Sequence, residues 1–103
     1  MTGGRHETLV ALRVSDQDGY DRYRAAMTPL LEAAGGFFRA DFRVSEALVA
    51  DDPGTNRVFV ISFADEASKD AFFADPGYVR IKDEHFEGSV ASVCILGSWE
   101  TTA

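Results

Sequence analysis

The sequence predicts an α+β domain in which helices cover one face of a four-stranded antiparallel sheet. Three observations favour it. The length of 103 residues suits one domain. Residues 57–63, RVFVISF, form a short run of β-branched and aromatic side chains, which is typical of a buried strand. A capped helix follows directly, and residues 7–34 repeat the strand-to-helix order. The full order of strand, helix, strand, strand, helix, strand is that of a ferredoxin-like βαββαβ sandwich.

The first strand is expected over residues 7–14, ETLVALRV. Thr8, Val10, Leu12 and Val14 share one face and the alternating residues share the other. Both faces are largely apolar, which favours a strand that is covered on both sides.

The first helix is expected to begin at a cap formed by Ser15-Asp16 and to end at Gly35-Gly36. Pro29 predicts a kink, with Thr28 capping the second piece, because proline lacks the N–H donor. One buried stripe is formed by Tyr20, Tyr23, Met27, Leu30, Leu31 and Ala34.

A long second strand is expected over residues 37–49, FFRADFRVSEALV. Arg39, Asp41 and Arg43 alternate with apolar residues, so these charges are expected on one face. Residues 45–46 break the alternation and indicate a bulge or bend. Residues 50–56, ADDPGTN, are typical of a turn.

The second half repeats this pattern. Asp65 is placed to cap a helix that stops at residues 75–77, Asp-Pro-Gly. A further helical turn or two follows and ends at Gly88, and residues 89–97 form the last strand with Trp99 just beyond it. We expect a single domain over residues 7–100, with a flexible leader at residues 1–6 and a frayed tail at 101–103.

Composition excludes several classes of protein. The net charge of −7 disfavours binding to nucleic acid or an anionic membrane surface. No stretch approaches the roughly 20 apolar residues of a membrane span. Cys94 is the only cysteine, so neither an internal disulfide nor a cysteine metal cluster is possible, and a reducing, cytoplasmic location is expected. No motif indicates a metal or another cofactor.

The apolar character of both sheet faces has a further consequence. Two helices cover only one face, and an exposed apolar patch of that size normally marks an interface. We therefore expect a homodimer that packs sheet face against sheet face into a barrel-like core.

Two segments carry a family resemblance. Residues 8–40, TLVALRVSDQDGYDRYRAAMTPLLEAAGGFFRA, and residues 57–81, RVFVISFADEASKDAFFADPGYVRI, resemble a family of small dimeric α/β-barrel proteins known only as a domain of unknown function. Residues 82–86, KDEHF, look like the second-helix region of the related antibiotic-biosynthesis-type monooxygenases, where a histidine often precedes an aromatic residue. The resemblance implies the dimeric barrel and no agreed chemistry.

His85 is the candidate catalytic residue. A neutral imidazole can accept an acidic substrate proton near neutral pH. The alternative is a structural histidine at a helix end, packed with Phe86. His6 lies in the expected leader and is interpreted as incidental.

Tyr23, Arg39 and Asp41 are the candidate substrate-binding residues. Tyr23 can donate a phenolic hydrogen bond to a ligand, or its ring, like that of Tyr20, can fill the core. Arg39 can hold an anionic group, whereas the alternative is an ion-pair ladder of Arg39, Asp41 and Arg43 at a surface or interface. Trp99 is expected to anchor an interface or an edge.

Two functions follow. The first is a homodimer that binds a small organic molecule without catalysis, because no catalytic constellation is evident. The alternative is a cofactor-independent monooxygenase or isomerase acting on an aromatic or polyketide-like compound. In that alternative Tyr23 orients the substrate, His85 assists proton removal and Arg39 balances negative charge.

Overall fold

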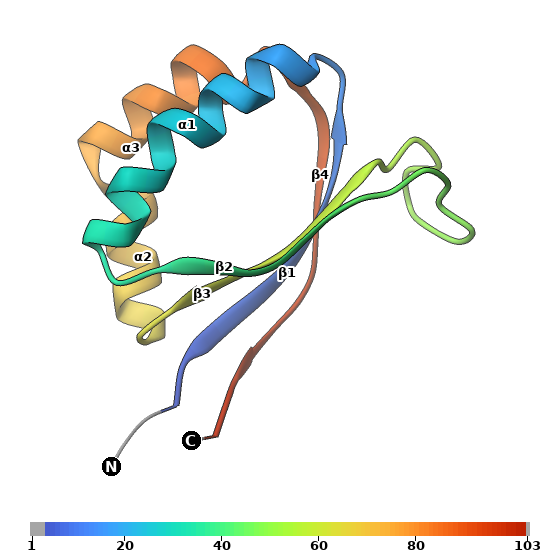
Figure 1. The fold of residues 1–103 in the computed structure, drawn as a ribbon. Helices are drawn as coiled ribbons and strands as arrows, with labels where there is room; N and C mark the ends of the chain where they lie inside the picture. Colours follow the sequence, from blue (N-terminus) through green and yellow to red (C-terminus); the bar gives the residue numbers. More distant parts are fainter. Residues whose placement is uncertain (1–3, 103) are drawn as a thin grey trace.

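A computed structural model describes residues 4–102 and contains one four-stranded antiparallel sheet with helices against one face (Figure 1). The strand order is β2-β3-β1-β4, so the first and third strands are central. This arrangement confirms the predicted ferredoxin-like α+β fold. The strands are β1 (His6–Val14), β2 (Phe37–Arg43), β3 (Arg57–Phe63) and β4 (Val90–Glu100).

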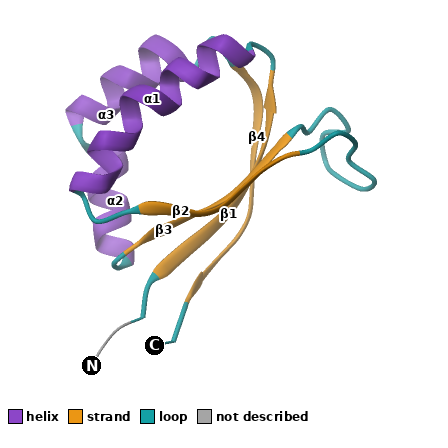
Figure 2. Ribbon diagram, viewed as in Figure 1, coloured by secondary structure: helices purple, strands orange, loops and turns teal. Residues whose placement is uncertain are grey.

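The helical layer has four segments (Figure 2): α1 (Gln17–Ala33), α2 (Glu66–Ala74), α3 (Pro76–Ile81) and the π-helical turn η1 (Lys82–Phe86). The predicted caps are confirmed, because Asp16 accepts from the Gly19 N–H at 3.1 Å and Asp65 accepts from the Ser68 N–H at 2.7 Å. Asp75 ends α2 and caps α3. These caps use donors that a helix start leaves without partners.

Helix α1 continues through Pro29, so the expected division into two pieces is wrong. The Thr28 hydroxyl donates to the carbonyl of Arg24 at 2.6 Å instead of capping a second piece. The helix ends before Gly35, whose φ of 79° is the left-handed conformation that glycine adopts without strain.

The core lies between the helices and the sheet. Its central side chains are the predicted stripe of α1 and the inward-facing residues of β1 and β3. They include Leu12, Val14, Tyr20, Tyr23, Met27, Leu31, Ile61 and Phe63. The opposite, helix-free face of the sheet carries Leu9, Val58, Val60, Phe37, Phe42 and Trp99 by strand register.

Strand β2 is shorter than expected and ends at Arg43. A register shift between Phe38 and Ala40 places a bulge at Arg39, so the expectation of three charges on one face is wrong. Residues 44–56 form a loop that extends away from the domain (Figure 1). Asn56 closes its base, because its side-chain amide exchanges hydrogen bonds with the backbone of Val14 at 2.8 and 3.0 Å.

Strand β4 is longer than expected and includes Trp99. Its register with β1 shifts twice. Val93 and Ile95 pair with Leu12 and Val10 and therefore share the helix-covered face, whereas Trp99 pairs with Glu7 on the helix-free face.

The two ends of the described chain are paired. Arg5 and Thr101 exchange backbone and side-chain hydrogen bonds of 2.7 and 2.8 Å, and β1 begins at His6. The first strand therefore begins one residue before its expected start, and Thr101 is hydrogen-bonded to Arg5, directly before β1. Residues 1–3 of the expected leader and residue 103 of the expected tail lie outside the described residues.

Candidate functional site

A cavity of about 480 Å³ lies between the sheet and the helical layer. Its walls are mainly apolar and include the aromatic side chains of Tyr20, Tyr23, Phe38, Phe59, Phe73, Tyr78 and Phe86. Val93 and Ile95 of β4 line it and are more than half exposed, so the cavity opens to solvent beside β4. A cavity of this volume and apolar lining suits a small organic molecule.

A pair of tyrosine hydroxyls lies in this wall. The Tyr23 and Tyr78 hydroxyl oxygens are 2.8 Å apart, and both residues are 5% exposed. Burial raises the pKa of Tyr23, with a further contribution from Tyr78, and burial also raises the pKa of Tyr78. Both hydroxyls therefore keep their hydrogens at neutral pH. Their mutual contact uses one of the two hydrogens, and the other is left to donate to a ligand.

Arg24 of α1 supplies a fixed positive charge to the cavity wall. Its Nε donates to the Tyr20 hydroxyl at 2.8 Å, and its guanidinium lies 3.7 Å from the centre of the Phe38 ring. Asp41 lies behind it, with an Oδ2 3.0 Å from Nη2 of Arg24.

Asp41 is held mainly by Arg57, whose Nε and Nη2 donate to its two carboxylate oxygens at 2.9 Å each. Burial acts to raise the pKa of Asp41, but the Arg57 hydrogen bonds and the charges of Arg24 and Arg57 outweigh it and lower the pKa. Asp41 therefore stays ionised and fixes both arginines instead of facing the cavity.

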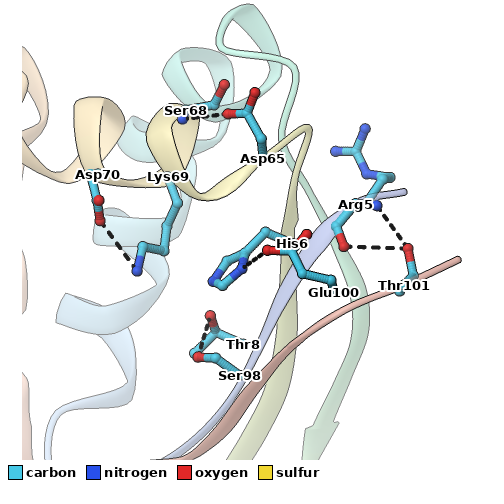
Figure 3. A network of polar contacts seen from close by, with 10 residues as sticks. All are labelled: Arg5, His6, Thr8, Asp65, Ser68, Lys69, Asp70, Ser98, Glu100 and Thr101. Atoms are coloured by element: carbon cyan, nitrogen blue, oxygen red, sulfur yellow. Dashed lines mark hydrogen bonds and ion pairs between the residues drawn. The ribbon is translucent and has the colours of Figure 1, made fainter. Parts of the chain in front are cut away.

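Beside the polar end of the cavity lies His6, which is not among the lining residues (Figure 3). The His6 side chain is buried, with the residue only 5% exposed, and its Nδ1 lies 2.9 Å from a carboxylate oxygen of Glu100. Thr8 and Ser98, which pair one step further along the same two strands, line the cavity with their hydroxyls 3.2 Å apart. Lys69 of α2 also lines this end.

The ring of His6 has a second, unused nitrogen. Nε2 is buried and has no hydrogen-bond partner within residues 4–102. Figure 3 shows this side of the ring directed away from Glu100, toward Lys69 and the Thr8–Ser98 pair. His6 therefore lies in β1 and not in the expected leader. Its pairing with Phe63 places its side chain on the helix-covered face of the sheet, where those of Thr8 and Val10 also lie.

His85 lies in η1, next to the cavity residue Phe86. Its Nε2 is 3.7 Å from an oxygen of Glu84, and its backbone carbonyl accepts from the Ser89 hydroxyl at 2.7 Å. The cavity lining includes Phe86 but not His85. The structure thus brings Tyr23, but not His85, into this wall, and the catalytic role of His85 stays a prediction.

Arg39 lies on the helix-free face, away from Tyr23 and Asp41. It pairs with the carboxylate of Glu7, which is 2% exposed. Burial acts to raise the pKa of Glu7, but hydrogen bonds from Arg39 and Ser62 and the Arg39 charge outweigh it and lower the pKa. The three substrate-binding candidates therefore do not form one site.

The described part of the chain, residues 4–102, lacks the signatures of a metal site and of a membrane span. This part of the chain holds no group of three His, Cys, Asp or Glu side chains that could bind a metal ion. None of its helices is long and apolar enough to cross a membrane.

Comparison with solved structures shows the same fold in several proteins. A protein of unknown function from Rhodopseudomonas palustris aligns with a TM-score of 0.80 at 18% identity, over 100% of this chain and 85% of that one. A dimeric protein of unknown function with a ferredoxin-like fold from Bacteroides fragilis gives 0.60 at 12% identity, over 93% and 95%. A putative antibiotic biosynthesis monooxygenase from Bacteroides thetaiotaomicron gives 0.54 at 15% identity, over 88% and 84%.

Sequence comparison gives the family. Among curated proteins no match to the chain is found. The model of one family, described as a domain of unknown function (DUF1330), matches residues 8–98, which contain nearly all of the sheet and the whole helical layer. The chain belongs to the DUF1330 family.

Proposed function

We propose that this protein binds a small, flat, largely apolar organic molecule in the cavity between the sheet and the helices. The observation that carries the proposal is the aromatic-walled cavity of about 480 Å³ with the Tyr23–Tyr78 hydroxyl pair in its wall. This volume falls within the range of about 300–1,000 Å³ for small-molecule sites.

The chemistry of the wall narrows the ligand. Aromatic side chains favour a ring that can stack or meet them edge-on. The free hydroxyl hydrogen of the tyrosine pair favours a ligand with an oxygen acceptor, and Arg24 favours partial negative charge. We therefore infer a hydroxylated or carbonyl-bearing aromatic compound.

The test uses Met27, which lines the cavity and is 1% exposed. The chain has two methionines, so methyl-¹³C labelling gives a spectrum in which one signal reports on the cavity. Titration with 4-nitrophenol and related phenols is expected to shift the Met27 methyl signal in a saturable way. An unchanged signal at millimolar probe would overturn the proposal.

A matched pair of variants locates the binding. Ile95 lines the cavity opening and is 65% exposed, so Ile95→Trp is expected to obstruct the cavity with little effect on the fold. Leu48, 86% exposed in the loop of residues 44–56, provides the control Leu48→Trp. If the phenol no longer shifts the Met27 methyl signal in Ile95→Trp but still does so in Leu48→Trp, the ligand binds in the cavity. Equal binding by the two variants argues against binding in the cavity.

We also propose that two copies pack through their helix-free faces. Phe42 and Trp99 are 59% and 41% exposed on this face, around the Glu7–Arg39 ion pair. The similar Bacteroides fragilis protein is dimeric, which supports a dimeric state for this chain. Sedimentation at micromolar concentration is expected to give a dimer for the wild type and a monomer for Phe42→Glu. Val79→Glu, on α3, is the control, and a monomeric wild type would contradict the proposal.

A second candidate function is catalysis without a cofactor, as a monooxygenase or isomerase acting on an aromatic compound. It is favoured by the Tyr23–Tyr78 hydroxyl pair in the cavity wall and by the fold shared with a putative antibiotic biosynthesis monooxygenase. Oxygen uptake or isomerisation with bound phenols tests it, and unchanged turnover in His85→Ala would exclude His85 from the reaction. A cytoplasmic location is part of the same proposal, supported by a single cysteine that is not in a disulfide.

A further inference from the structure

We propose that the cavity selects aromatic compounds with a single negative charge, above all aromatic carboxylates, and that Lys69 and Lys82 hold the charged group at its rim. The proposal deepens the proposed function and rests on it, because it requires that the cavity binds a ligand. It is carried by the signs of the charges that line the cavity, by the position of the two lysines and by the distribution of the neighbouring carboxylates.

The charges that line the cavity have the opposite balance to the chain as a whole. The chain carries 10 basic and 17 acidic residues and a net charge of −7. The cavity lining nevertheless includes three cations, Arg24, Lys69 and Lys82, and one anion, Asp70. The chain has two lysines, and both line this cavity. A concave site with a local excess of positive charge attracts anions even in an acidic protein.

The two lysines reach the cavity from different helical segments. Lys69 lies in α2 and Lys82 is the first residue of η1. Their side chains are 24% and 43% exposed, so each borders both the cavity and the solvent. Figure 3 shows Lys69 extending from α2 toward the side of the sheet that carries Thr8 and Ser98. A lysine stem that follows an apolar wall keeps its ammonium group at the edge of that wall. A ligand whose ring lies against the aromatic walls can therefore keep an acid group at the rim, beside these ammonium groups.

The lining charges are not equally compensated. Asp41 lies 3.0 Å from Nη2 of Arg24 and is itself outside the cavity lining, so Arg24 adds little net charge to the cavity. Asp70 does line the cavity, and its carboxylate lies 3.2 Å from the ammonium nitrogen of Lys69. Two lysines against one lining carboxylate leave one positive charge, which matches a ligand with one negative charge.

Three exposed carboxylates lie near this end of the cavity. Glu87 lies 3.5 Å from the ammonium nitrogen of Lys82 without lining the cavity, and Glu100 contacts His6. The side chains of Asp70, Glu87 and Glu100 are 68%, 58% and 63% exposed. Water screens such exposed groups, so they weaken the positive field of the lysines only in part. An ammonium group has three hydrogens, so each lysine can keep its carboxylate partner and still donate to a ligand.

The experiment compares 4-nitrobenzoate with 4-nitrobenzamide, which have nearly the same shape and differ by one charge. Both are titrated at neutral pH and low ionic strength, with the Met27 methyl signal as the measure of binding. The acid is expected to bind about tenfold more tightly than the amide, because it accepts hydrogen bonds from charged donors. Added salt is expected to reduce this ratio. Equal affinities at low ionic strength would overturn the inference.

Substitutions assign the preference to the lysines. Lys69→Met and Lys82→Met keep an unbranched side chain and remove its charge, and each is expected to weaken binding of the acid by about threefold. The double variant is expected to bind acid and amide equally, and its binding of the amide shows that the cavity is intact. Arg80→Met removes an exposed cation of α3 outside the cavity lining and is the matched control. It is expected to keep the tenfold preference, whereas a preference that survives in the double variant would overturn the inference.

Asp70→Asn tests the same charge balance through a gain of affinity. It removes the one negative charge from the cavity lining and the partner at 3.2 Å from Lys69. Binding of 4-nitrobenzoate is expected to become about threefold tighter, with binding of the amide unchanged. A damaged fold cannot produce a selective gain, so unchanged binding of the acid would contradict the proposed charge balance.

A direct measurement avoids dependence on the variants. Because the chain has two lysines, selective ¹³C labelling of lysine gives two Cε signals. Saturation of the wild type with 4-nitrobenzoate is expected to shift these signals more than saturation with 4-nitrobenzamide does. Lysine signals that respond equally to the two probes would overturn the inference.

The two proposals fail in different ways. If the Met27 methyl signal responds to phenols but the acid binds no better than the amide, only the selection of anions is wrong. If the Met27 signal responds to none of these compounds, the cavity does not bind such ligands and both proposals are wrong.

Discussion

Arg39 and Asp41 are separated by one residue in β2, yet their side chains form ion pairs on opposite faces of the sheet. Arg39 pairs with Glu7 on the helix-free face, and Asp41 pairs with Arg57 and Arg24 on the helix-covered face. The bulge at Arg39 causes this, because one extra residue inverts the side-chain alternation that follows it. The strand thereby supplies a charge to each face.

The Glu7–Arg39 pair gives the first prediction. Arg39→Ala leaves the carboxylate of Glu7, which is 2% exposed, without its cationic partner. We expect the free energy of unfolding to fall by about 1–3 kcal/mol, because the variant loses a hydrogen bond between two charged groups, one of them buried. Urea unfolding followed by circular dichroism measures it. Arg43→Ala, which removes an exposed arginine of the same strand, is expected to change stability by less than about 0.5 kcal/mol.

The pKa of Glu7 gives a second prediction. Because this pKa is lowered in the folded protein, the folded state binds the proton less readily than the unfolded chain does. The stabilisation is complete above the unfolded pKa of about 4.3 and is lost as the pH falls through the lower, folded pKa. Glu7→Gln is therefore expected to flatten the stability curve on the acid side. If the stability of Glu7→Gln falls with acid pH as steeply as that of the wild type, the lowered pKa of Glu7 does not contribute to the pH dependence.

The stability of Glu7→Gln will still fall in part as the pH becomes acidic. The pKa of Asp41 is also lowered, since its hydrogen bonds from Arg57 and the charges of both arginines outweigh burial. The pKa of Asp65 is lowered by its hydrogen bonds with Ser68. The contribution of Glu7 is therefore measured as the difference between wild type and Glu7→Gln in how the free energy of unfolding changes with pH.

The tyrosine pair gives a third prediction, on the alkaline side. Burial raises the pKa of Tyr23 and Tyr78, so stability is complete below the unfolded tyrosine pKa of about 10 and is lost as the pH rises above it. Tyr23→Phe is expected to reduce this alkaline slope. At neutral pH it is expected to cost about 1 kcal/mol, because it removes the hydrogen bond of 2.8 Å to Tyr78.

A double-mutant cycle separates this bond from other effects of the substitutions. Tyr78→Phe and the double variant complete the cycle, and a coupling energy near zero would show that the hydroxyl contact does not stabilise the fold. Thermal unfolding at neutral and alkaline pH provides all four values.

The cap of α2 gives a fourth prediction. The Asp65 side chain accepts from the Ser68 N–H at 2.7 Å at the start of a helix of only 9 residues. Asp65→Ala is expected to reduce stability by about 1 kcal/mol. Since Lys69 of this helix lines the cavity, the variant is also expected to weaken phenol binding. Glu46→Ala, in the exposed loop, is the control. If Asp65→Ala and Glu46→Ala reduce stability equally, the loss is not due to the helix cap.

Sequence reasoning succeeded where the determining interactions are local. The caps at Asp16 and Asp65 were predictable because a capping side chain bonds a backbone N–H three residues later. The α1 stripe was predictable because burial follows the helical period. These elements, in this order, were sufficient for the fold class, which the comparisons confirm.

The candidate site was less predictable because it depends on pairing between distant segments. The bulge at Arg39 is a property of the β2–β3 register, and the alternation of Arg39, Asp41 and Arg43 contains no sign of it. His6 was assigned to a leader because the polar residues before Glu7 have no periodic pattern of their own. Only pairing with β4 makes His6 a buried strand residue.

His6 and Glu100 are 94 residues apart in sequence. Synthesis runs from the N-terminus, so His6 is made 94 residues before its carboxylate partner. Until β4 pairs with β1, the imidazole remains in water and the aromatic cavity lacks one wall. The wall that β4 contributes to the cavity therefore forms only after the other three strands of the sheet have been synthesised.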